Sequence, residues 1–129
     1  MATIRQLEDI EAWKMARQLV KTVYELTTKR EFSRDLRLCD QIRAAATSVV
    51  SNIGEGFERS GDKEFRQFLS VAKGSAGEVR AQLYVALDAG FLTEAEFQDA
   101  LDLASSTERL LGGFIRYLRN SQLGGAKYK

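Results

Sequence analysis

The sequence predicts an all-α protein whose helices form an antiparallel up-down-up-down four-helix bundle. Three observations predict this fold. The 129 residues include no proline, and a proline-free chain favours long uninterrupted helices over turn-rich β structure. Apolar residues recur at intervals of three and four in four segments, which is the helical period. The connections between these segments are only a few residues long, so neighbouring helices must run in opposite directions.

The first two predicted helices extend from about Asp9 to Lys29 and from about Arg34 to Glu58. Ser33 stands just before the second helix, where we expect its side chain to cap the first turn. Each segment has one apolar line that should face the core. The expected core residues are Trp13, Ala16, Val20 and Val23 in the first helix and Cys39, Ile42, Ala46, Val49 and Ile53 in the second.

The third and fourth predicted helices extend from about Asp62 to Asp88 and from Thr93 to about Asn120. Gly90 is expected to adopt a left-handed conformation that ends the third helix. Thr93 and Glu96 have the spacing of a capping box at the start of the fourth. The expected core residues are Phe65, Leu69, Ala72, Ala76, Val79, Leu83 and Ala86 in the third helix and Phe97, Leu101, Ala104, Leu111, Ile115 and Leu118 in the fourth.

These helices define one domain over residues 9–120. We expect residues 1–8 to be a flexible N-terminus and residues 121–129, which lack periodicity, to be a disordered tail. The N-terminus carries charges where a signal peptide would be apolar, and no run of 18 apolar residues occurs. We therefore expect a cytoplasmic protein without a membrane partner.

The composition excludes several kinds of chemistry. The chain has no histidine and a single cysteine, Cys39, so it cannot build a histidine-dependent catalytic triad, a His-ligated zinc site or an intramolecular disulfide. Cys39 occupies a core position and is expected to be an inert packed thiol. Carboxylates near the turn around residue 60 are expected to pair with neighbouring basic residues. We expect no catalytic residue, no cofactor and no metal site; an enzyme with a carboxylate site at a subunit boundary is the least favoured alternative.

A second line of residues lies beside the core line on the second and third helices. A helix in an isolated bundle needs one buried line, so a second one indicates a further contact, either between helices or between subunits. Small residues, including two glycines, align on a third face of the third helix. Ordinary boundary positions remain the alternative interpretation. The candidate subunit or helix-register contacts are Gln41, Ser48, Asn52, Glu55, Phe68, Gly74, Ser75, Gly77 and Glu78.

The charge balance argues against a polyanionic partner for the chain as a whole. Lys and Arg number 19 and Asp and Glu 18, for a formal net charge of +1. Binding to nucleic acid would therefore depend on local clusters of basic residues. One end of the bundle gathers such a cluster, although acidic residues lie among its members. The candidate nucleic-acid contacts are Arg59, Lys63, Arg66, Arg116 and Arg119.

Two short elements resemble a known family. Ser48 to Arg59 contains an Asn-x-x-Glu-Gly element, and Gly74 to Glu78 contains a Gly-Ser-x-x-Glu element. Together they resemble the bacterial four-helix-bundle family of proteins encoded in large-subunit ribosomal RNA intervening sequences. The resemblance extends over most of the folded chain. Two residues depart from the family pattern, because Val50 stands where the family often has proline and Gly54 where it usually has alanine.

The resemblance implies an assembly and a function. The family is similar in fold to accessory proteins of diversity-generating retroelements, which form pentameric rings and bind nucleic acid. The chain is therefore expected to be a non-enzymatic, self-associating protein, a homopentameric ring that acts as a structural or interaction scaffold. The alternative is a nucleic-acid-binding accessory protein for RNA or DNA, in which the ring repeats the basic clusters. Periodicity by itself indicates only the additional contact lines.

Overall fold

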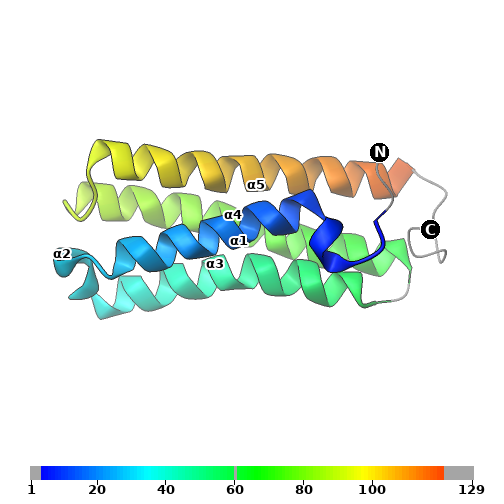
Figure 1. Cartoon of the computed structure of the whole chain (residues 1–129), viewed down its shortest axis with the longest axis horizontal. Coiled ribbons are helices and arrows are strands. Elements are labelled where there is room, and N and C mark those ends of the chain that lie inside the picture. Colours follow the sequence, from blue (N-terminus) through cyan, green and yellow to red (C-terminus); the bar gives the residue numbers. More distant parts are fainter. Residues whose placement is uncertain (1–3, 60, 121–129) are drawn as a thin grey trace.

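The computed structural model describes residues 4–59 and 61–120, and within them it contains helices and no strand (Figure 1). The predicted all-α bundle is confirmed. In chain order the elements are the 3₁₀ helix η1 (Leu7–Asp9), α1 (Glu11–Thr27), the short α2 (Arg30–Ser33), α3 (Leu36–Phe57), α4 (Asp62–Asp88) and α5 (Glu94–Asn120).

The four long helices lie side by side, and successive ones run in opposite directions (Figure 1). Helix α1 packs against α3 and α5, and α4 packs against the same two helices. The short helix α2 lies in the connection between α1 and α3 at one end of the bundle. None of the described helices is both long and apolar enough to cross a lipid bilayer.

The predicted core is confirmed completely in α3 and α4, where all five and all seven expected residues are buried. In α5 five of the six expected residues are buried and Leu101 is half-buried. Helix α1 differs, because Trp13 and Val20 are only half-buried. Its buried line has the same helical spacing but is displaced around the helix. The indole of Trp13 lies at the edge of the core, with the guanidinium of Arg17 5.2 Å from its ring centroid. The buried residues of α1 are Ala12, Ala16, Leu19, Val23, Leu26 and Thr27.

The helix boundaries follow the predicted signals with one exception. Thr93 and Glu96 form the expected capping box, with N–H to side-chain oxygen distances of 2.9 and 3.1 Å. Gly90 has the expected left-handed φ of 83°. The cap of α3 was predicted wrongly, because Asp35 rather than Ser33 accepts a hydrogen bond from the first turn. Ser33 ends α2 and donates its hydroxyl to that helix, so the unexpected helical turn displaces the start of α3.

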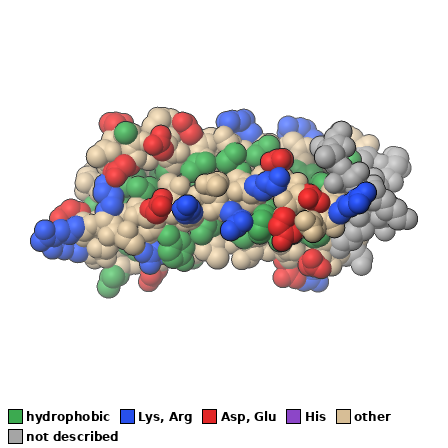
Figure 2. Space-filling view, in the orientation of Figure 1, with side chains coloured by type: hydrophobic (Ala, Val, Ile, Leu, Met, Phe, Trp, Pro, Cys, Tyr) green, Lys and Arg blue, Asp and Glu red, His purple; other side chains and the backbone are tan. Residues whose placement is uncertain are grey.

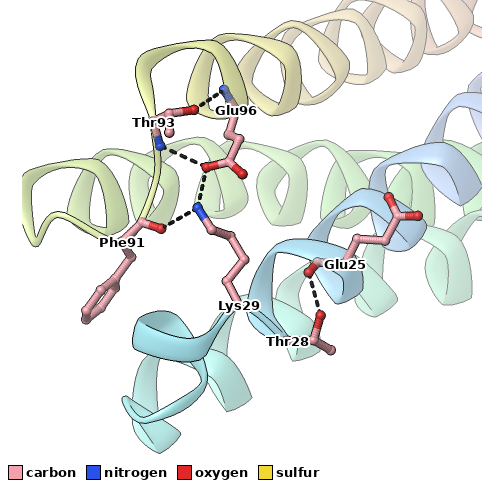
Figure 3. A network of polar contacts seen from close by, with 6 residues as sticks. All are labelled: Glu25, Thr28, Lys29, Phe91, Thr93 and Glu96. Carbon is pink, nitrogen blue, oxygen red and sulfur yellow. Dashed lines mark hydrogen bonds and ion pairs between the residues drawn. The ribbon is translucent and has the colours of Figure 1, made fainter.

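A polar network closes the α2 end of the bundle (Figure 3). Lys29, at the end of α1, forms an ion pair with Glu96 and donates to the carbonyl oxygen of Phe91 at 3.1 Å. The Lys29 ammonium and then the backbone N–H of Thr93 lower the pKa of the Glu96 carboxyl. The same carboxylate thus caps α5 and attaches the α4–α5 connection to α1.

The N-terminal residues pack more than expected. Ile4 and Leu7 are half-buried against the part of the core built around Phe65 and Leu69, and the Asp9 carboxylate accepts from two backbone N–H groups of the 3₁₀ turn. This packing differs from the flexible terminus expected over residues 1–8, since apolar contacts offset the entropy of ordering the segment. Residues 1–3 and the tail at 121–129 lie outside the described residues.

Candidate interaction surfaces

The outward faces of α3 and α4 carry little charge. Between residues 41 and 54, the exposed residues of α3 are Gln41, Ala44, Thr47 and Ser51, none of which is charged. The exposed residues of α4 between 65 and 87 include two charged ones, Lys73 and Glu78. On α1 the pattern is the opposite, and the exposed residues are Glu11, Lys14, Arg17, Gln18, Lys21, Tyr24 and Glu25. Figure 2 shows side chains of both signs spread along the face on which α1 lies.

Three predicted contact residues meet between α3 and α4. The hydroxyls of Ser48 and Ser75 are 2.8 Å apart, and the amide of Asn52 donates to the carbonyl and the hydroxyl of Ser48 at 2.8 and 2.9 Å. A hairpin that turns at residue 60 would by sequence alone place Ser48 opposite Ala72, about one turn nearer the loop. Side chains lean toward the N-terminus of their own helix. In an antiparallel pair the α3 side chain therefore points away from the loop and the α4 side chain points toward it. Ser48 consequently meets a residue farther along α4, which is Ser75.

The predicted glutamates do not join this network. Glu55 pairs with Arg59 one turn later at 2.8 Å, and Glu78 accepts from the side chain of Gln82 at 3.2 Å. Both carboxylates are exposed, and so is Gln41. Phe68 is half-buried, with the guanidinium of Arg59 5.1 Å from its ring centroid. These side chains border the α3–α4 contact.

The two glycines of α4 have different surroundings. A Cβ atom on Gly74 would meet nothing within 4 Å, so this glycine lies on the open outward face. A Cβ atom on Gly77 would lie 3.3 Å from the carboxylate of Glu108 on α5. Gly77 therefore belongs to the contact between α4 and α5 within one chain, which the alignment of small residues could not distinguish from an outward face.

The predicted basic cluster is divided by the fold. Arg59 pairs with Glu55 at the end of α3, Lys63 is exposed in the first turn of α4, and Arg119 is exposed in the last turn of α5. Arg116 instead lines a groove between α4 and α5. The groove has a volume of about 520 Å³ and is lined by Lys73, Arg80, Ser105, Glu108, Arg109 and Arg116. Three of its basic residues were not among the predicted contacts, because they are far from the end of the bundle in sequence.

A second groove of about 720 Å³ crosses the outward face of α3, from Tyr24 of α1 on one side to Ser48 and Asn52 beside α4 on the other. Its polar lining includes Arg43, which donates to the hydroxyl of Thr27 at 2.8 Å and stacks on Tyr24 with its guanidinium carbon 4.7 Å from the ring centroid. The remaining lining residues are small or polar: Asp40, Ala44, Thr47, Ser48, Ser51 and Asn52. The groove thus covers the outward face of α3, and Asp40 and Arg43 are its charged members.

The relationship to known proteins agrees with this architecture. The family described as 23S rRNA-intervening sequence protein matches residues 8–113, which is most of the chain. The chain belongs to this family. The resemblance predicted from the two short elements is therefore confirmed. No curated protein matches this intervening-sequence protein.

A solved structure shares the fold of this intervening-sequence protein. It is a protein with unknown function from the S23 ribosomal protein family of Bacteroides thetaiotaomicron VPI-5482. The two structures superpose with a TM-score of 0.76 and 17% sequence identity, over 86% of this chain and 99% of the other. At this identity the similarity concerns the fold.

Nothing in the described part of this intervening-sequence protein indicates catalysis. Its residues contain no group of three or more His, Cys, Asp or Glu side chains placed to hold a metal ion. The Cys39 thiol is buried, and burial raises its pKa, which disfavours the nucleophilic thiolate. The pKa of Asp9 is lowered by hydrogen bonds from the backbone of Arg5 and Gln6, as in a helix cap. The pKa shifts of Cys39 and Asp9 are thus explained by burial and by backbone hydrogen bonds, respectively.

Proposed function

We propose that this intervening-sequence protein is a non-enzymatic scaffold whose subunits associate through the outward face of α3 and α4. The observation that carries the proposal is the absence of charge from the exposed residues of α3 between residues 41 and 54. Charged residues are depleted at the centres of protein interfaces. The mixed charges along α1 show that the chain places charge on its other outward faces.

Exposed apolar side chains on α4 support the same surface. Val71 and Val85 are 54% and 53% exposed, and they lie on the outward side of α4 away from the buried line. Two adjacent helices over about 18 residues present a face of about 27 by 20 Å. That is on the order of 500 Å² on each subunit, divided between its contacts with two neighbours.

Gly74 gives a further reason to expect a neighbouring helix. A glycine in the middle of a helix costs about 1 kcal/mol relative to alanine. Within the single chain a Cβ atom at this position would meet nothing within 4 Å, so packing inside the subunit does not require the glycine. A helix of a neighbouring subunit lying across Gly74, Ser70 and Ala81 would require small side chains there.

The proposed assembly is a homopentameric ring, as the family resemblance implies, in the cytoplasm of a bacterium. A closed ring needs two different complementary surfaces on each subunit. The outward face of α4 supplies one, and the groove across the outward face of α3 supplies the other. Because Tyr24 and Ala44 line that groove, a neighbouring α4 helix would contact both an aromatic ring and small side chains.

Light scattering coupled to gel filtration tests this proposal. The wild-type chain should elute with about five times the mass of one subunit. Val71→Glu combined with Val85→Glu should reduce the mass to that of a monomer while the helical circular dichroism spectrum is retained, since exposed substitutions outside an interface change stability by about 0.5 kcal/mol or less. Leu36→Glu is the matched control, because Leu36 is 72% exposed but lies at the start of α3. A monomeric wild-type protein at micromolar concentration would refute the proposal.

A further inference from the structure

The groove between α4 and α5 holds a concentration of positive charge that the net charge of the chain conceals. We call it the α4–α5 groove, and its lining residues are Lys73, Arg80, Ser105, Glu108, Arg109 and Arg116. Four of these residues are basic and one is acidic, so the lining has a formal charge of +4 − 1 = +3. The whole chain has a formal charge of +1.

The basic residues follow the helical repeat along both walls of the groove. Lys73 and Arg80 on α4 are seven residues apart, and Arg66 stands seven residues before Lys73; Arg109 and Arg116 on α5 are also seven apart. Residues at this spacing lie on nearly the same side of a helix, two turns apart. Lys73 and Arg80 are therefore about 10 Å apart along α4 at 1.5 Å per residue, and they face Arg109 and Arg116 across the groove.

Among the described residues, only part of this charge is paired with a carboxylate. The carboxylate of Glu108 accepts from Arg80 at 3.0 Å. No carboxylate of the described residues forms an ion pair with Lys73, Arg109 or Arg116. Arg109 donates to the hydroxyl of Ser106 at 3.0 Å, which leaves its charge in place. A ligand with several negative charges would thus find three cations in one groove.

Gly112 and Gly113 leave part of the α5 side of the groove without side chains. A Cβ atom on Gly112 would lie 3.5 Å from Cε of Lys73 and 3.6 Å from Nη1 of Arg116. Both basic side chains therefore lie beside the backbone of Gly112. Gly113 follows directly, and the nearest side-chain atom to its Cβ position is Nη2 of Arg116 at 3.8 Å. The Arg116 guanidinium therefore lies over backbone, where an anion can reach it.

We propose that the α4–α5 groove binds the phosphodiester backbone of a single nucleic-acid strand. Three cations without a carboxylate partner come from both walls of the groove, so a ligand with more than one negative charge is needed to contact them all. Arginine predominates, and its planar guanidinium donates two parallel hydrogen bonds to a phosphate. Lining residues with large apolar side chains, which anchor peptides in grooves, are absent from this described surface. A single backbone can enter a recess between two packed helices, where a duplex is too wide.

Contacts of this kind position the strand and carry no sequence information. The groove should therefore bind DNA and RNA strands of different sequence with similar affinity and with a marked dependence on salt. Lys73 borders the outward face of α4 proposed for self-association, whereas Arg109 and Arg116 lie on α5.

Fluorescence anisotropy of the full chain with labelled oligo-dT and oligo-rU tests the proposal. Three engaged cations predict that affinity falls about 20-fold between 50 and 200 mM salt. The triple variant Lys73→Gln, Arg109→Gln and Arg116→Gln should lower the slope of log affinity against log salt by about 2 and abolish most binding at 50 mM. Arg80 is left in place because its ion pair with Glu108 supports the α4–α5 contact.

The matched control removes the same charge from another face. Lys14, Arg17 and Lys21 line a shallow groove on α1, and their replacement by glutamine should leave the affinity within about twofold of wild type. Equal losses in both triple variants would overturn the proposal in favour of attraction by net charge. Absence of binding at 50 mM salt, or binding of an acidic peptide but not of either oligonucleotide, would also overturn it. Circular dichroism of each variant verifies that it is folded.

Discussion

Gly56 is the position at which α3 and α4 approach each other most closely among the described glycines. A Cβ atom placed on it would lie 2.7 Å from Cβ of Phe68 and 2.8 Å from Cδ1 of Phe65. The Phe68 Cβ atom is attached directly to the α4 backbone, so it cannot yield by rotating a side chain. Gly56→Ala therefore requires the two helices to separate.

The expected loss can be estimated from two opposing effects. Adding a methyl group to a packed core costs up to about 3 kcal/mol when the backbone must move. Replacing glycine by alanine inside a helix returns about 1 kcal/mol. The net destabilisation is about 2 kcal/mol, which corresponds to a fall in melting temperature of about 8 °C for a chain of this size.

Gly113→Ala is the matched control, because its Cβ atom would make only an ordinary contact, 3.8 Å from Nη2 of Arg116. It should raise the melting temperature by a few degrees through the same helix-propensity gain. Thermal melts followed by circular dichroism at one protein concentration measure both variants. If Gly56→Ala melts at or above the wild-type temperature, the close approach of α3 and α4 is wrong.

Three further predictions concern polar and sulfur groups. Glu96→Gln should lower the free energy of unfolding by about 1–2 kcal/mol at neutral pH. The pKa of the Glu96 carboxyl is lowered in the folded protein, so the difference between wild type and variant is fully present above pH 4.5, the ordinary pKa of a glutamate. Thermal melts at lower pH should show this difference shrink. Cys39 should react with a thiol reagent only as the protein unfolds, since it is 4% exposed; rapid reaction of the native protein would contradict its burial. Ser48→Ala and Ser75→Ala should each cost about 1 kcal/mol, with a double variant less destabilised than the sum if the two hydroxyls interact.

The short elements that identified the family have physical explanations in the structure. In the Asn-x-x-Glu-Gly element, Asn52 bonds to Ser48, Glu55 pairs with Arg59, and Gly56 leaves room for the ring of Phe65 and the Cβ atom of Phe68. In the Gly-Ser-x-x-Glu element, Ser75 meets Ser48 across the helix pair. The sequence analysis predicted that Ser48, Asn52 and Ser75 make contacts. It could not predict their register, which depends on the lean of side chains from two antiparallel helices.

The basic side chains illustrate what sequence proximity cannot show. The sequence predicted that Arg116 lies near Arg59 and Lys63, because all three were expected at the same end of the bundle. The fold places it beside Lys73, 43 positions earlier in the chain, because α4 and α5 are antiparallel neighbours. The seven-residue spacing of Arg66, Lys73 and Arg80 is present in the sequence and predicts that they lie on nearly the same side of a helix. Its significance depended on knowing that Arg109 and Arg116 lie on the opposite wall.

The sequence by itself determined the elements that depend on local interactions: the long helices of an all-α fold, the capping box at Thr93, the left-handed Gly90 and the complete buried line of α4. Local periodicity and capping suffice for these because each involves residues within a few turns. Only the tertiary structure decided which of two adjacent lines α1 buries, that α2 and Asp35 start α3, and which outward faces are uncharged or basic. Those features depend on contacts between helices that are distant in sequence, and the helical period is the same for a face toward the core and a face toward a neighbour.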